Sequence, residues 1–569
     1  AQGPRAADAC LNLWPLPALR PMAFFRLVGR SLETAGHGIA TGATALADEV
    51  TGGRVPELRE ARRDQEQRLH AAARGVEENA RVVGGDLGRA LATTGASTQV
   101  LARVVTSPDQ LRRLLELVET YDFPCFLRVL LQRSQLPPDF FPGWIRRAGG
   151  YFPKFSQVLS VRADLIRNRE VLDQFARCLE DMPARPGETV REHLASQGWS
   201  PELCNSVGDV LNAGTVAQVN ELTLPDRSPA IVKVAWPDTR RQMQTDFRLF
   251  SHARSILSAL RLEDEEAHAV AAIFSAVNRN EPAVLREFEM QEEMRSLRMA
   301  AVLCTADWVE AYAAWLLAAR AAIEALPPAL ALLVQAFAAE TTANGGPVVR
   351  VPGVALDSLC SESVLVMRRA GGESLHRLLT GDAGEAGRHE AAKVLIGSAV
   401  PFIGWLLLCK STSHLAHVDP HPGNFRWEAT SRTLWVLDWG SSVTLSTEQR
   451  TALCLLVLLI AEDGADGAIA DTARSFGVRS DNSARLALLM RGMLNATINH
   501  AARDALNNAA MDSILNDVSD EVVPVVRCLA TLGGLLKEVQ QKVRDSFQQD
   551  VPLSLAALWA PFAARGLQS

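Results

Sequence analysis

The chain has 569 residues, of which 48% are hydrophobic and 22% charged, and its formal net charge is -7. This composition predicts a globular protein of several structural units, and the acidic balance gives no support for binding nucleic acid. Its nine cysteines include no C-x-x-C pair, which argues for a reducing compartment and against structural zinc or a disulfide framework.

Residues 1–50 are predicted to be a targeting or flexible segment. The first 32 residues carry four arginines and one acidic residue, Asp8, a bias typical of organelle transit peptides. Residues 51–140 are charged and alanine-rich, with apolar residues at helical spacing, and are predicted to form an N-terminal helical region. The proline-rich stretch "QLPPDFFPGW" at 135–144 ends this region.

Residues 141–204 are predicted to form a helical extension, because "KFSQVLSVRADLIRNREVLDQFARCLEDMP" has the pattern of helix, turn and helix. Residues 205–372 then change to short β-rich runs, "TVAQVNELTL" and "AIVKVAW", with a helical insert from 240 to 340 and two or three further strands between 348 and 372. Everything after 373 is predicted to be helical apart from "RTLWVLDWG" at 432–440. The order predicts an α+β chain with a small β-rich lobe followed by a larger helical lobe.

No transmembrane helix is predicted. The longest apolar stretch, residues 394–409, has 16 residues and contains Gly397, Pro401 and Gly404. It is short for a membrane span, so a buried helix is favoured.

Lys233 lies within the apolar strand "AIVKVAW". A lysine in such a place is most often a strand residue that faces solvent, but it is also the residue with which a kinase sheet grips the phosphates of a nucleotide. The acidic stretch "REFEMQEEMRSLRMA" at 286–300 contains Glu287 and Glu293, and Glu293 fits the helical glutamate that orients such a lysine. An acidic helix is otherwise usually a solvated face.

The stretch "HVDPHPGNF" at 417–425 admits two functional interpretations. Its histidines and Asp419 are metal-ligand types, and with His414 they would suit a metal-dependent hydrolase. Pro420 and Pro422 make the segment a loop, however, and Asp419 and Asn424 have the five-residue separation of a kinase catalytic loop. A purely structural proline-rich turn is the third interpretation.

Two further segments follow the order of a kinase site. A strand containing Met367 leads into Gly371 and Gly372, which is the pattern of a hinge that binds a base through backbone groups. In "LWVLDWG", Asp438 ends an apolar strand 14 residues after Asn424, which is the position of the magnesium-binding D-F-G aspartate. Such features are common singly, but their joint order and spacing are not.

This constellation resembles the UbiB family of atypical kinases, also called AarF-domain kinases, whose loop H-x-D-P-H-P-G-N is matched at every specified position by "HVDPHPGN". The resemblance extends from about 140 to the end of the chain. "PKFSQVLSVRADLI" is similar to the family's K-x-G-Q signature, and "NAGTVAQVNE" to its alanine-rich loop. The resemblance implies a protein-kinase-like bilobal fold with an N-terminal helical extension.

The resemblance also implies roles for single residues. Lys233, Glu293 and Asp419 would be catalytic, and Asn424 and Asp438 would bind magnesium. The set implied to bind ATP or ADP is Ala213, Gly214, Thr215, Lys233 and Met367. The signature helix would contribute Lys154, which would pair with Glu287, and Gln157.

Two residues depart from the family pattern. Ser156 replaces the signature glycine, and Gly214 lies in the loop usually written A-A-A-S. A glycine there restores backbone freedom over the phosphates, so nucleotide preference or phosphotransfer competence is expected to differ.

Helical sequence resumes at "LSTEQR", a few residues after Gly440, which leaves no room for a peptide-docking activation segment. We therefore expect an ATPase or a small-molecule or lipid kinase rather than a peptide kinase. The resemblance implies a role in prenyl-quinone biosynthesis or lipid homeostasis in a mitochondrion or plastid. It also implies a lipid or prenyl-quinone precursor as partner, association with quinone-biosynthesis enzymes, and peripheral membrane association. The alternative is an inactive nucleotide-gated lipid-binding scaffold.

Overall fold

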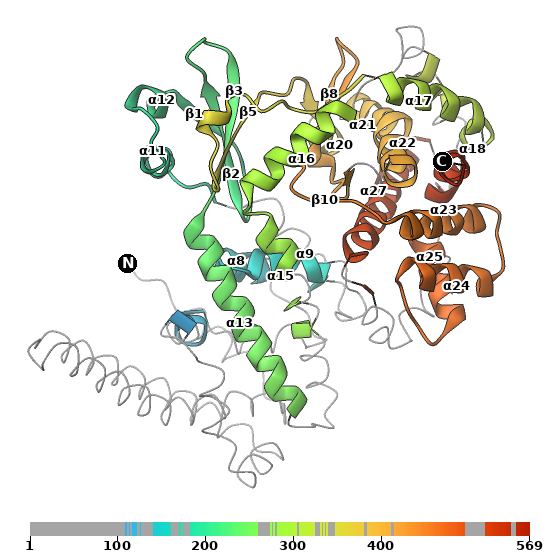
Figure 1. The fold of residues 1–569 in the computed structure, drawn as a ribbon, viewed down its shortest axis with the longest axis horizontal. Coiled ribbons are helices and arrows are strands. Elements are labelled where there is room, and N and C mark those ends of the chain that lie inside the picture. Colours follow the sequence, from blue (N-terminus) through green and yellow to red (C-terminus); the bar gives the residue numbers. More distant parts are fainter. Residues whose placement is uncertain are drawn as a thin grey trace, which may run out of the picture. The chain divides into compact units, whose positions relative to one another are not determined.

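Figure 1 shows the computed structural model of the chain. The structure describes residues 140–160, 183–259, 281–303, 306–324, 348–380, 384–410, 415–494, 521–547 and 554–568, with scattered positions at 109–126, 170–175, 273–278, 331–339 and 518–519. The predicted targeting segment and most of the predicted helices of 51–140 lie outside these residues. The chain divides into two compact units, Ala1–Cys178 with Arg241–Asn278, and Leu179–Arg240 with Arg279–Ser569.

The first unit contains helices α8 (Phe140–Ala148) and α9 (Phe152–Ser160) and most of α13 (Pro237–Ala259). Its described core is aromatic, with Phe126 in ring contact with Phe141, Trp144 and Phe152. Helix α9 is the predicted signature helix, and its start is fixed by a buried ion pair.

That ion pair joins Arg113 to Asp246 of α13, with Nε and Oδ1 2.8 Å apart. The other carboxylate oxygen accepts a hydrogen bond from the backbone N–H of Tyr151 at 2.9 Å, and Arg113 also donates to the Ala148 carbonyl. Gly150 between them has a φ of +58°, and a Cβ at this position would collide with the Asp246 carboxylate. Glycine is therefore required where the chain turns from α8 into α9.

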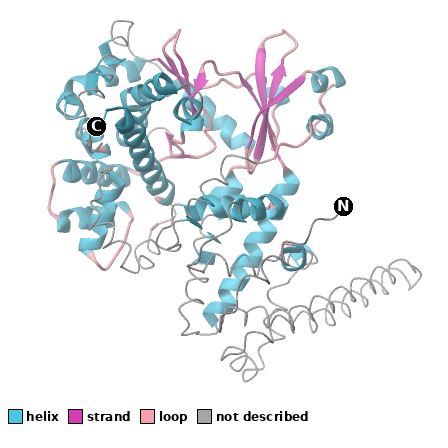
Figure 2. Cartoon of the chain, turned by 180° about the vertical axis from the view of Figure 1, so that it is seen from behind, coloured by secondary structure: helices cyan, strands magenta, loops and turns pink. Residues whose placement is uncertain are grey.

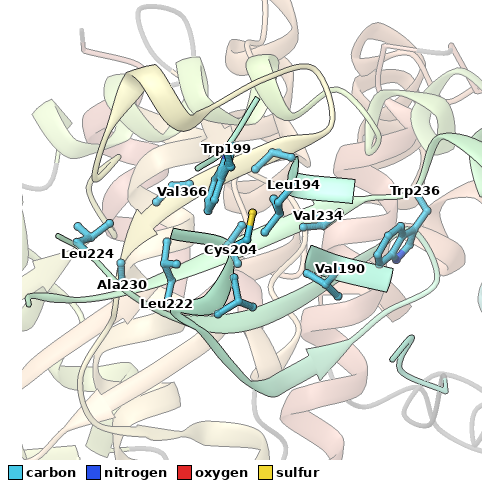
Figure 3. Packing of buried hydrophobic residues seen from close by; sticks show 13 residues of the cluster. Val190, Leu194, Trp199, Cys204, Leu222, Leu224, Ala230, Val234, Trp236 and Val366 are labelled. Carbon is cyan, nitrogen blue, oxygen red and sulfur yellow. The ribbon is translucent and has the colours of Figure 1, made fainter. Parts of the chain in front are cut away.

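The second unit begins with an antiparallel sheet in the strand order β1-β2-β3-β5. Its strands are β1 (Val207–Ala213), β2 (Ala217–Thr223), β3 (Pro229–Ala235) and β5 (Val364–Arg368). Because side chains alternate across a strand, Val232 and Val234 face one side of the sheet and Lys233 the other. The apolar side is covered by α11 (Gly187–Ser196) and α12 (Pro201–Asn205), and Figure 3 shows this buried cluster.

A second sheet has the order β4-β9-β8-β6, formed by β4 (Val348–Arg350), β9 (Thr433–Val436), β8 (Phe425–Glu428) and β6 (Glu373–Ser374). The two-residue strands β7 (Ala416–His417) and β10 (Ser442–Val443) pair separately. Figure 2 shows the strands in magenta among the cyan helices. The prediction that only 432–440 is non-helical after residue 373 is therefore wrong at β6, β7, β8 and β10.

The remaining helices make up most of the second unit, as the sequence predicts. Helices α15 (Glu281–Arg286) and α16 (Met290–Leu303) follow α13, and the insert continues with α17 (Ala306–Ala318) and α18 (Arg320–Glu324). The C-terminal part contains α20 (Leu375–Thr380), α21 (Gly384–Val394), α22 (Val400–Trp405), α23 (Thr447–Ala461), α24 (Asp466–Phe476), α25 (Ser483–Leu494), α27 (Val523–Phe547) and α28 (Leu555–Gly566).

Tryptophan hydrogen bonds join the insert to the C-terminal helices. The Trp315 indole N–H of α17 donates to the Leu558 carbonyl of α28 at 2.7 Å, and Trp559 of α28 donates to the Val400 carbonyl at 2.9 Å. Buried indole groups need such acceptors, so these bonds and their apolar rings fix α17, α22 and α28 together.

One helical stretch of the described residues, Gly384–Lys410, is long and apolar enough to cross a membrane. Within its most apolar window, 89% of the residues are buried inside the protein, which is the behaviour of a core helix. The bent pair Met290–Val302 and Asp307–Ala318 would be a second such stretch if counted as one span. The prediction of a buried helix at 394–409 agrees with this packing.

Replacing Asp246 with alanine would leave the guanidinium of Arg113 buried without its carboxylate. Breaking a buried ion pair in this way costs about 3–5 kcal/mol, so we expect hydrogen exchange in α8 and α9 to accelerate markedly. The control is Asp471→Ala, which removes an exposed ion pair with Arg474 and should leave exchange in α8 and α9 unchanged. Equal exchange in both variants would contradict this role of Asp246.

Candidate functional site

Lys233 forms ion pairs with two carboxylates in the second unit. Its Nζ lies 2.9 and 2.8 Å from the two carboxylate oxygens of Glu293 and 3.2 Å from Oδ1 of Asp438. Glu293 lies in the first turn of α16 and is only 2% exposed, whereas the Asp438 side chain is 44% exposed. The structure thus brings together three residues that the sequence predicts for one site.

The three charges shift one another's pKa values. Burial opposes the charged ammonium of Lys233, but Asp438 and Glu293 outweigh it and raise the pKa of Lys233. Burial raises the pKa of Glu293 to about 7, against the opposing effect of Lys233. Burial alone would raise the pKa of Asp438, but Lys233 lowers it below its ordinary value. Asp438 therefore remains an anion at neutral pH beside a permanently charged lysine.

Asp438 has a left-handed backbone, with φ at +52°, which is uncommon for a residue other than glycine. Its Oδ1 accepts a hydrogen bond from the Gly440 N–H at 3.3 Å. The intervening Trp439 is fully buried, and its indole N–H donates to the Val436 carbonyl at 3.1 Å. These bonds over-determine the turn, so the carboxylate is held toward Lys233.

His417 joins the loop at 417–425 to the strand that precedes Asp438. Its Nε2 lies 3.0 Å from the Leu437 carbonyl, and its Nδ1 accepts a hydrogen bond from the backbone N–H of Asp419 at 3.3 Å. This pattern assigns the proton to Nε2. Burial lowers the pKa of His417, so the ring is neutral. Both ring nitrogens are engaged, and His417 is a structural residue.

The loop itself is closed by backbone and side-chain bonds. The Asn424 amide nitrogen donates to the Asp419 carbonyl at 2.9 Å and lies 3.5 Å from the Asp419 carboxylate. His421 accepts the Gly423 N–H through Nδ1 and so caps a short 3₁₀ turn, Pro422–Asn424. The Leu437 N–H donates to the Asn424 carbonyl at 2.8 Å, which fixes the loop against the Asp438 segment.

The hydrolase interpretation finds no support in this part of the chain. His417 has no ring nitrogen available for a metal, and His414 lies outside the described residues. Among the residues that the structure describes, no three His, Cys, Asp or Glu side chains are grouped so that they could hold a metal ion.

The predicted nucleotide loop connects β1 and β2. Ala213 ends β1, the Gly214 N–H donates to the Ala217 carbonyl at 2.9 Å, and Thr215 lies in the turn. Met367 is buried in β5, where it pairs with Ile231 on one side and forms a bridge with Val354 on the other. A strand slot opposite Lys233 is filled by Leu365, so the Met367 row lies one step nearer the hinge.

The signature residues lie elsewhere in the chain. Lys154 and Gln157 belong to α9 in the first unit, and Glu287 precedes α16 in the second. Their predicted pairing therefore stays a prediction. Ser156, which replaces the expected glycine, is buried, and its hydroxyl donates to the Pro153 carbonyl at 2.7 Å. The helix itself thus satisfies the added polar group.

Residues 331–471 match the family model described as the ABC1 atypical kinase-like domain. Curated relatives named "Probable protein kinase UbiB" are 28% identical over 116 residues in Xylella fastidiosa strain M23 and 26% identical over 132 residues in Marinobacter nauticus. The chain belongs to the UbiB/ABC1 family. The family assignment confirms the resemblance in the sequence, and the fold is the expected α+β, kinase-like one.

The alignments are partial. They cover 20% of this chain and 21% of the Xylella relative, and 23% of this chain and 24% of the Marinobacter relative. A solved structure titled as the Rv3197–erythromycin complex from Mycobacterium tuberculosis gives a TM-score of 0.41 at 15% identity, over 79% of this chain and 97% of that chain. The UbiB/ABC1 match includes the loop with Asp419 and Asn424 as well as Asp438.

The raised pKa of Glu293 predicts a pH-dependent stability. An unfolded glutamate ionises near 4.5, and this one near 7, so its favourable contribution is complete below the lower value and is lost as pH rises through the higher one. Urea unfolding of the wild type and Glu293→Gln should therefore diverge between about pH 5 and pH 8, by up to about 3 kcal/mol in favour of the glutamine variant. A constant difference across this range would contradict the assignment.

Proposed function

We propose that the protein binds a magnesium–nucleotide complex, ATP or ADP, and catalyses phosphoryl transfer from ATP to water or a small-molecule or lipid acceptor. The observation that carries this proposal is the ion-pair arrangement of Lys233 with Glu293 and Asp438, next to the loop that carries Asp419 and Asn424. A kinase site needs a strand lysine oriented by a helical glutamate and an aspartate that ends a strand. All three are present.

The residues fit magnesium, which prefers oxygen ligands and tolerates few substitutes. Because the Asn424 amide nitrogen donates to Asp419, its amide oxygen is turned away from that bond and is suited to a cation. Asp438 is anionic and 44% exposed. Asn424 and Asp438 would hold the ion, which when bound neutralises charge on the phosphates.

The protein's own side chains would act mainly by position and charge. Lys233 would bind the phosphates, and Glu293 holds its ammonium in place. Asp419 would accept or orient the acceptor hydroxyl or water, since its backbone is fixed by His417 and Asn424. The loop Ala213–Thr215 would close over the phosphates from β1 and β2.

The short connection after Asp438 supports a non-peptide acceptor. Only the two-residue strand β10 and the capping residue Ser446 separate Gly440 from α23, which begins at Thr447. A peptide-docking activation segment has no space between them. The acceptor is therefore proposed to be water, a small molecule or a lipid.

The names of the curated relatives support a role in prenyl-quinone biosynthesis, with a lipid or quinone precursor and enzymes of that pathway as partners. Peripheral membrane association is part of this proposal. The compared relatives are bacterial, so a mitochondrial or plastid location rests on the arginine bias of residues 1–50 alone.

Magnesium-dependent phosphate release from ATP tests the proposal, with and without liposomes and a prenylated phenol. Asp438→Asn should lower the rate at least about a hundredfold, because it removes charge that stabilises the transition state. Asp471→Asn, an exposed aspartate of α24, should leave the rate unchanged. Wild-type protein that binds nucleotide without any turnover would contradict the enzymatic part of the proposal.

A further inference from the structure

Three arginines gather at the hinge end of the second unit and are called here the arginine cluster: Arg369, which follows β5, Arg377 of α20 and Arg426 of β8. Arg426 pairs with Ser374 in the β6–β8 register. Its guanidinium donates to the Gly371 carbonyl at 3.2 Å and to the Gly372 carbonyl. These hinge acceptors are neutral, so they leave the charge of Arg426 uncompensated.

The charges of the cluster repel one another. Burial lowers the pKa of Arg426, and the charges of Arg369 and Arg377 lower it further, with Glu373 opposing them. Arg369 has a carboxylate partner, Glu221 of β2, at 2.8 Å. Arg377 is exposed, and Arg426 is half-buried. A fold whose net charge is -7 thus concentrates like positive charge at one place.

The cluster borders the loop with Asp419 and Asn424. His376, the neighbour of Arg377, stacks on His421 with ring centroids 5.8 Å apart. His421 caps the turn that ends at Asn424, and Arg426 follows Asn424 by two residues. The cluster therefore lies beside the residues proposed to orient the acceptor.

The phosphates proposed to bind Lys233 are not the anion that would suit this cluster. Lys233 pairs with Leu365, and Arg369 lies four residues farther along the same strand direction, roughly 13 Å away at the rise of a β-strand. A neutral base at the hinge would gain a cation–π contact but would not relieve the repulsion between guanidinium groups. A phosphate or carboxylate would relieve it and would also accept charge-assisted hydrogen bonds.

We propose that the arginine cluster binds an anionic group, a phosphate or carboxylate, carried by the acceptor molecule. This inference rests on the proposed function, since it assigns the substrate class of the same site. It predicts an acceptor that bears its charge at the hinge side of the loop and its reacting oxygen near Asp419.

Glycerol 3-phosphate is a suitable soluble probe, and phosphatidylcholine vesicles containing phosphatidic acid present the same phosphate on a lipid. We expect saturable binding of glycerol 3-phosphate to the full chain by calorimetry, weakened by salt. Arg377→Glu should reduce the affinity at least about tenfold, because it replaces an attractive charge with a repulsive one. Arg377 is exposed, so this variant should fold.

Arg479→Glu, which reverses an exposed arginine after α24, is the matched control and should bind like the wild type. Vesicles that compete with glycerol 3-phosphate would identify a lipid phosphate as the source, and vesicles that do not compete would identify a soluble one. Equal loss in both variants, or no binding of either probe, would overturn the inference. Magnesium–ADP binding measured on the same samples keeps the two proposals apart, because its absence would contradict the proposed function instead.

Discussion

The structure of the site depends on the burial of one lysine. The ammonium of Lys233 is 12% exposed and can stay charged there only because Glu293 and Asp438 lie within 3.2 Å of it. These residues come from β3, from α16 and from the turn after β9, so the ion pairs fix a strand, a helix and a turn against one another. Removing either carboxylate would leave a buried charge with one partner. The geometry of the site and the stability of its surroundings are therefore coupled.

The loop at 417–425 separates structural from chemical roles among residues of similar type. His417 is neutral and bonded through both ring nitrogens, and His421 caps a turn. Their bonds hold the backbone, which leaves the Asp419 carboxylate and the Asn424 amide oxygen for chemistry. The prolines support this division, because they prevent the helix on which a histidine pair would bind a metal. The hinge side of the same loop carries positive charge, which gives the site a polarity from Lys233 to Arg426.

The sequence predicted the family, the α+β fold and the residues that meet at Lys233, because these follow from motifs whose order and spacing are joint constraints. It missed β6, β7 and β10, which have two residues each and are too short to show a period of two. It also missed the arginine cluster and the bond from Trp315 to α28, since these contacts join positions far apart in sequence. The pairing of Lys154 with Glu287 and the domain boundaries remain predictions.

Calorimetric titration with ADP, with and without magnesium, tests the central claim most directly when wild type is compared with Lys233→Met. The account predicts saturable, magnesium-dependent binding by the wild type and its loss in the variant, with the variant's circular dichroism unchanged. Methionine retains the length of the side chain and removes the charge that would bind the phosphates. Equal affinity in the two proteins, or no binding by the wild type, would contradict the assignment of this site to a nucleotide.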